Sequence, residues 1–115
     1  MAKYERHLTG NFDSLLKTLD DGILGGSISA SFQDGSDYSE GHVRCAVRVY
    51  ERYSWIGGNR LAANITLLGN GDRLFLSLIS SGGSQAMFIK INTWGEEAFT
   101  EKIAKLIEQW EQERR

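Results

Sequence analysis

The sequence contains no proline and only one cysteine among its 115 residues. Without proline, every turn depends on Gly, Asn, Asp or Ser, and a slow folding step caused by proline isomerisation is excluded. A lone Cys45 cannot form an intramolecular disulfide, which favours a reducing compartment. We therefore expect a cytoplasmic protein.

Long apolar runs and an excess of one charge are also missing. The first seven residues hold no apolar run of signal-peptide length, and no segment approaches the roughly 18 apolar residues that span a bilayer. The formal net charge is -2, with acids and bases interspersed, so the surface as a whole does not attract nucleic acid or an anionic membrane. We expect a soluble protein without membrane contact.

Apolar residues make up 41% of the chain, which is enough to build a core without a metal or a disulfide. Residues 1–115 are therefore predicted to form one domain. Period-2 alternation, broken by Gly- and Asn-rich segments, predicts an antiparallel meander. The expected strands are residues 3–9, 27–33, 42–53, 60–67, 72–80 and 86–91, with turns at 34–37, 57–59, 70–71 and 81–84.

In the strand at 42–53 the alternation places one set of side chains inward. This inward set is Val43, Cys45, Val47 and Val49. The outward set is Arg44, Arg48, Tyr50 and Arg52. In the strand at 72–80, apolar residues occupy both faces, so that a second surface should cover the outer one. Asn70 and Gly71 form the strongest turn signal, because a primed turn with two positive φ angles tolerates Asn-Gly best.

Helical spacing predicts one amphipathic helix before the sheet and one after it. The first begins at the N-cap Asn11 and ends at Gly25 and Gly26 through a left-handed residue. Its apolar stripe is Phe12, Leu15, Leu16, Leu19 and Ile23. The second begins at a capping box formed by Thr93 and Glu96. Its apolar stripe is Phe99, Ile103, Leu106, Ile107 and Trp110.

The element order is strand, helix, strands, helix. It predicts a two-layer α+β fold in which a meander sheet of five to six strands carries both helices on one face. This order resembles TATA-binding-protein-like domains and a shortened helix-grip fold of the Bet v 1-like ligand carriers. In length and appearance the chain is also similar to small uncharacterised bacterial cytoplasmic proteins. These resemblances imply a fold and no particular functional residue.

Two binding hypotheses follow from this arrangement. Apolar side chains on the helix-free side would favour a homodimer formed through the sheet. The candidate interface is Arg44, Arg48, Tyr50, Arg52, Phe75, Ile79 and Phe88. The arginines with Tyr50 also resemble a nucleic-acid surface, but the neighbouring Glu40 and Glu51 argue against that partner.

The alternative is a cavity between the sheet and the C-terminal helix that holds an apolar small molecule. Its candidate lining is Tyr4, Arg6, Met87, Trp94, Phe99 and Trp110. A filled core is the competing interpretation, because protein interiors are normally close-packed.

Catalytic and metal sites have no support in the sequence. His7, His42 and Cys45 lack the short spacing of zinc ligands, and an inward Cys45 would be an unreactive thiol. The glycine-rich segments at 22–27 and 81–84 lack the Gly-Lys-Ser/Thr ending of a phosphate loop. We therefore predict a non-enzymatic binding or interaction module without a cofactor, which self-associates; the carrier is the alternative.

Overall fold

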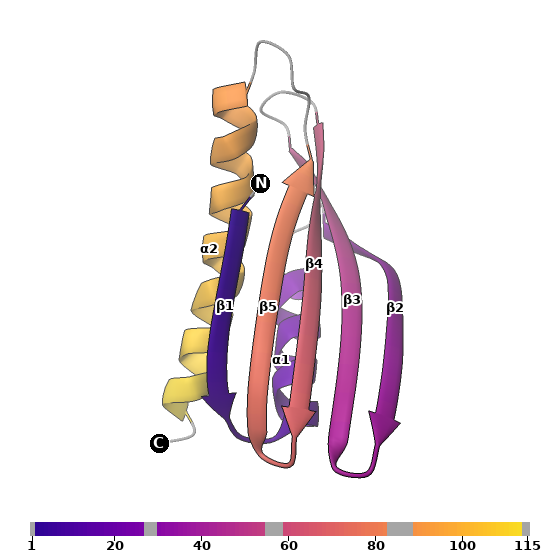
Figure 1. The fold of residues 1–115 in the computed structure, drawn as a ribbon. Coiled ribbons are helices and arrows are strands. Elements are labelled where there is room, and N and C mark those ends of the chain that lie inside the picture. Colours follow the sequence, from indigo (N-terminus) through magenta and orange to yellow (C-terminus); the bar gives the residue numbers. More distant parts are fainter. Residues whose placement is uncertain (1, 27–29, 55–58, 83–88, 114–115) are drawn as a thin grey trace.

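The computed structural model describes residues 2–26, 30–54, 59–82 and 89–113. Within these residues the chain forms five strands and two helices (Figure 1). In chain order they are β1 (Ala2–Thr9), α1 (Phe12–Gly25), β2 (Ala30–Glu40), β3 (Val43–Ser54), β4 (Asn59–Asn70), β5 (Arg73–Gly82) and α2 (Ile89–Glu113).

The strands form one sheet in the order β1-β5-β4-β3-β2, and every neighbouring pair is antiparallel. Strands β2 to β5 follow one another as a meander, and β1 is added beside β5. The connection through α1 crosses the whole sheet, because it leaves one edge strand and returns as the other (Figure 1). The expected α+β fold with an antiparallel sheet is confirmed.

Helix α1 begins as its sequence predicts. The side chain of Asn11 accepts a hydrogen bond from the backbone N–H of Ser14 at 2.8 Å, which satisfies an amide that the first turn leaves free. The expected left-handed end is wrong, since Gly26 has φ of -91° and stays right-handed. Its carbonyl instead accepts a hydrogen bond from Nζ of Lys102 on α2.

Strand β2 is longer than expected. The turn predicted at residues 34–37 is wrong, because these residues continue β2 after a bulge between Phe32 and Asp34. An edge strand tolerates such polar, turn-forming residues, since its outer side needs no partner strand. The chain reverses instead at Gly41, whose φ is 59°.

The hairpin turn between β4 and β5 lies one residue later than expected. Asn70 still pairs with Arg73, so the central turn residues are Gly71 and Asp72. Only Gly71 has a positive φ, of 61°, and the expected pair of positive φ angles is wrong. Glycine at the first central position alone is typical of a type II′ turn.

Helix α2 begins earlier than expected. It already includes Ile89, so the strand assigned to residues 86–91 is wrong over its last three residues, and Thr93 does not start the helix. Residues 86–88 lie outside the described part of the chain. An apolar-polar-apolar triplet fits helix and strand alike, which explains the error. The apolar stripe from Phe99 to Trp110 is confirmed, with Leu106 only partly buried.

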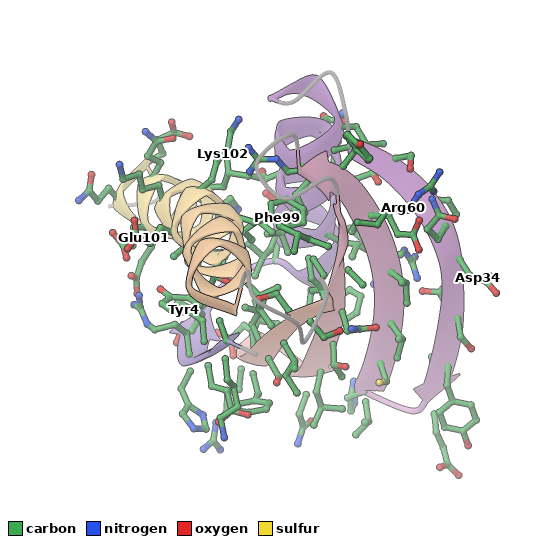
Figure 2. All side chains as sticks on the ribbon, turned by 90° about the horizontal axis from the view of Figure 1, so that it is seen from above. Tyr4, Asp34, Arg60, Phe99, Glu101 and Lys102 are labelled. Carbon is green, nitrogen blue, oxygen red and sulfur yellow. The ribbon has the colours of Figure 1, made fainter. Side chains whose placement is uncertain are left out.

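The core lies between the helices and the side of the sheet that they cover, which we call the covered face. Strands β4 and β5 contribute its centre as their alternation predicts. These buried side chains are Leu61, Ala63, Ile65, Leu67, Leu74, Leu76 and Leu78. Figure 2 shows Phe99 between α2 and the sheet.

Two hydrogen bonds and one close contact hold the helices to the sheet and to each other. Ser80 Oγ on β5 and Thr100 Oγ1 on α2 lie 2.9 Å apart inside the core. Trp110 Nε1 donates to Ser14 Oγ at 3.0 Å and joins the helices. Gly69 makes room for Phe12, since a Cβ at this position would lie 2.7 Å from the Phe12 ring.

Candidate interaction surface

The opposite side of the sheet carries no helix in the part of the chain that the structure describes, and Figure 1 views the molecule from this side. We call it the open face. The strand register aligns its side chains in four rows across the sheet. The rows are Lys3-Ile79-Asn64-Val49-Asp34, Glu5-Ser77-Thr66-Val47-Ser36, His7-Phe75-Leu68-Cys45-Tyr38 and Thr9-Arg73-Asn70-Val43-Glu40.

Large apolar side chains are exposed on the three inner strands of the open face, β3, β4 and β5. Val43, Leu68 and Ile79 are 39%, 41% and 36% exposed, and Tyr38 on the edge strand is 63% exposed. The other apolar members are half-buried among them. Val43 and Leu68 form one contiguous patch with the half-buried Cys45 and Phe75, and Ser77 separates Ile79 from it. A contiguous apolar patch marks an interaction site far more often than scattered side chains do.

Strand β3 is turned the other way from the sequence-based assignment. Val43, Cys45, Val47 and Val49 line the open face, and the even-numbered residues of β3 lie on the covered face. Tyr50 decides the orientation, because it is 1% exposed and its hydroxyl donates to Asp20 Oδ1 on α1 at 2.7 Å. Burial, then the bond to Asp20, raises the pKa of Tyr50, so the hydroxyl stays protonated and donates.

The three arginines of β3 lie at the margin of the helix layer. Their long stems cover apolar surface while each charged head reaches a partner, as is usual for arginine. Arg48 donates to Asp37 Oδ1 at 3.0 Å, and the guanidinium of Arg52 lies 5.5 Å from the centre of the Phe99 ring.

Arg44 borders a hollow of about 540 Å³ at the turn end of the sheet. Its guanidinium lies 4.2 Å from the centre of the Phe12 ring and donates to Asp13 Oδ2 at 2.9 Å. This hydrogen bond holds the pKa of Asp13 below its usual value. The cation is therefore already neutralised within the chain.

The residues of the predicted interface are thus divided between two surfaces. Phe75 and Ile79 lie on the open face, as predicted. Arg44, Arg48, Tyr50 and Arg52 lie on the covered face and cannot share a contact with them. Phe88 lies outside the described residues. The sequence analysis missed Leu68, which belongs to the same parity as the polar Asn64 and Thr66 and was therefore not recognised as part of an apolar patch.

The candidate pocket under α2 is closed where its residues are described. Phe99 and Trp110 are 1% and 4% exposed and belong to the packed core. Met87 and the side chain of Trp94 lie outside the described part.

Tyr4 and Arg6 face α2 from β1. Arg6 donates to the Tyr4 hydroxyl at 3.0 Å and to Glu111 Oε1 at 2.5 Å, and Tyr4 approaches Glu108 at 3.5 Å (Figure 2). These polar groups hold α2 against the edge of the sheet.

An open groove of about 560 Å³ lies elsewhere, between α1 and β2. Its apolar lining is Leu16, Leu24 and Phe32, and Phe32 is about half exposed. The charged residues Lys17, Asp20 and Arg48 surround this lining. No pattern in the sequence indicates this groove, because the groove depends on how far α1 extends over the edge strand.

Cys45 does not occupy the core position expected for it. It is half-buried on the open face, between Leu68 and Tyr38 in its row. His7 ends the same row three strands away, about 14 Å at the usual strand spacing, so the two side chains cannot form a catalytic pair. Within the described residues, no three His, Cys, Asp or Glu side chains form a group that would hold a metal ion.

A protein-family model matches residues 1–111 of the chain. The chain belongs to DUF6054, a family of unknown function. No curated protein and no solved structure matches this DUF6054 chain, so the likeness to TATA-binding-protein-like and Bet v 1-like folds stays a prediction from element order. Nothing in the family match suggests an enzymatic activity. No helix among the described residues of the DUF6054 chain is long and apolar enough to cross a membrane.

Proposed function

We propose that this DUF6054 protein is a small non-enzymatic interaction module that self-associates through its open face. The observation that supports this proposal most directly is the apolar surface on the three inner strands of the face, where Val43, Leu68 and Ile79 are exposed and Phe75 is half-buried. Burying such side chains against apolar surface contributes about 25 cal/mol for each Å² removed from water.

The size of the open face suits a stable contact between two proteins. Five strands at about 4.8 Å and about seven residues at 3.4 Å give a flat area of roughly 600 Å². Side-chain relief increases this value towards the roughly 800 Å² that each partner buries in an interface of standard size.

A second copy of the chain is the partner that this face fits best. Sheets pack face to face in many folds, about 10 Å apart and with nearly aligned strands. In a two-fold dimer the same patch serves both partners, so the apolar inner strands of one face cover the apolar inner strands of the other. The polar ends of the rows then form a solvated rim.

Native mass spectrometry of the full chain, purified from its own host, tests this proposal. We expect a dimer of bare chains. Ile79→Lys places a charge on the open face and should give a folded monomer, with folding checked by circular dichroism. Leu24→Lys is the matched control, because Leu24 on α1 is also 36% exposed, and it should stay dimeric. A wild-type monomer throughout the micromolar range would falsify self-association.

The second candidate function is carriage of an apolar small molecule. The exposed lining of the groove between α1 and β2, above all Phe32, favours it. The same spectra test this function, because a carrier would retain a fixed extra mass. We then expect Phe32→Ser to lose that mass and Phe75→Ser, on the open face, to keep it. Bare wild-type chains would count against a carrier.

A further inference from the structure

One row of the open face ends in two opposite charges. Lys3 ends it on β1 and Asp34 ends it on β2, at the two edges of the sheet. Both side chains are exposed, and neither forms an ion pair with any residue that the structure describes. Among the described residues Asp34 accepts the backbone N–H of Gly35, and Figure 2 shows Asp34 at the edge of the sheet.

The same polarity recurs at the turn end of the face. Arg73 on β5 lies towards the β1 edge, and Glu40 on β2 ends the opposite side of that row. Glu5 is an acid on the β1 side, and Ser77 Oγ donates to it at 3.2 Å. The open face is therefore basic at Lys3 and Arg73 towards one edge, and acidic at Asp34 and Glu40 along the other.

This polarity distinguishes between the two arrangements in which the face packs on its own copy with aligned strands. A two-fold axis across the strands lays β2 against β2, and the acidic edges repel each other. An axis parallel to the central strand β4 reverses the strand order, so β1 lies against the partner's β2 and β5 against the partner's β3. Opposite charges then meet at both edges, which suppresses the wrong arrangement.

We infer that the two-fold axis of the dimer runs along β4, with Lys3 of each protomer facing the partner's Asp34. This inference rests on the proposed self-association and specifies its geometry. Each row then packs against the same row of the partner, so Ile79 covers the partner's Val49 and Leu68 lies next to the partner's Leu68. The extended Lys3 side chain and the Asp34 side chain together reach across stacked sheets about 10 Å apart.

A zero-length cross-link tests this contact directly. A carbodiimide joins an amine to a carboxylate only when the two touch. Lys3 and Asp34 of one chain lie four strands apart, about 19 Å, so a link between them must join two chains. We expect peptide mass spectrometry of the covalent dimer to find Lys3 joined to Asp34. A covalent dimer without this link would overturn the inference.

Charge reversal gives a second, independent test at low ionic strength. Lys3→Glu and Asp34→Lys should each raise the dimer dissociation constant roughly tenfold, because each change creates two like-charge contacts. The double variant restores both contacts and should return to within about threefold of wild type. The control double variant, Lys3→Glu with Glu40→Lys, introduces the same charges without facing partners and should not recover.

The outcomes separate this inference from the proposed function. A wild-type monomer would remove both. A wild-type dimer in which the charge-swapped double variant binds no better than Lys3→Glu alone would refute the axis along β4 and leave self-association standing.

Discussion

The two faces of the sheet are built by the same strands, yet they impose different demands on sequence. On the covered face, Leu76 and Leu78 are completely buried, and the buried hydroxyl of Ser80 pairs with that of Thr100 on α2. On the open face, Leu68 and Ile79 are more than a third exposed beside Asn64 and Thr66. Alternation of apolar and polar residues therefore shows that a strand has two different faces. It does not show which face is buried, because that depends on which face the helices cover.

The largest loss of stability should come from shortening a buried side chain on the covered face. Leu76→Ala removes a fully buried side chain and should lower the free energy of unfolding by about 2–5 kcal/mol. Phe75→Ala, one residue away on the open face, should cost clearly less at low concentration, where self-association does not contribute. Urea unfolding of both variants measures the contrast, and equal losses would show that the two faces are not distinct.

The next largest loss of stability should come from overfilling a closely packed site on the covered face. Gly69→Ala pushes a Cβ against the buried ring of Phe12 and should cost about 1–3 kcal/mol. Phe12→Leu should relieve part of this cost. The double variant should therefore lose less stability than the sum of the losses of the two single variants. Additive losses in urea unfolding would mean that Gly69 is not required for the contact with Phe12.

The orientation of β3 is tested by a smaller change. Tyr50→Phe deletes only the hydroxyl that donates to Asp20 and should lower the free energy of unfolding by about 1 kcal/mol. Tyr38→Phe, on the open face of the edge strand, is the control and should change stability by less. If Tyr38→Phe had the larger effect in urea unfolding, our assignment of the two faces at β3 would be wrong.

The smallest effect belongs to the exposed pair Asp13 and Arg44 at the margin of the covered face. The hydrogen bond from Arg44 lowers the pKa of Asp13 below its ordinary value of 3.8, so the pair stabilises the fold above that pH. The contribution is lost as pH falls through the lowered pKa. Asp13→Asn should therefore slightly lower the melting temperature at neutral pH and lose that effect in acid. If Asp13→Asn lowered the melting temperature just as much in a chain that already carries Arg44→Gln, the ion pair would not be the cause.

Sequence reasoning succeeded where one face is uniformly apolar and the other is not. Every second residue from Leu61 to Leu67 and from Leu74 to Leu78 could be assigned to the core. Asn11 could be assigned to the start of α1. Sequence reasoning failed at β3, where the valines predict a buried face but line the open one. The hydrogen bond from Tyr50 to Asp20 decides the orientation, and it joins residues far apart in the chain. It also failed at β2, because residues 34–37 form good turns in isolation and are held extended only by pairing with β3.

Of the candidate surface, Phe75 and Ile79 could be placed from the sequence. The rows that run from Lys3 to Asp34 could not, because they depend on the register of four strand pairs and on β1 joining the sheet beside β5. No local pattern in the first nine residues indicates that partner.

The position of β1 also has a consequence for how the chain folds during synthesis. This strand leaves the ribosome first, yet its partner β5 follows three other strands and a helix. The β2–β5 meander is able to form from local hairpins, whereas β1 must wait for a contact between distant parts of the chain, and such contacts are slow. Before it pairs, β1 carries the charged side chains of Lys3, Glu5 and Arg6. Charged side chains protect an unpaired strand from aggregation. Of the five described strands, the first to be made should therefore be the last to be paired.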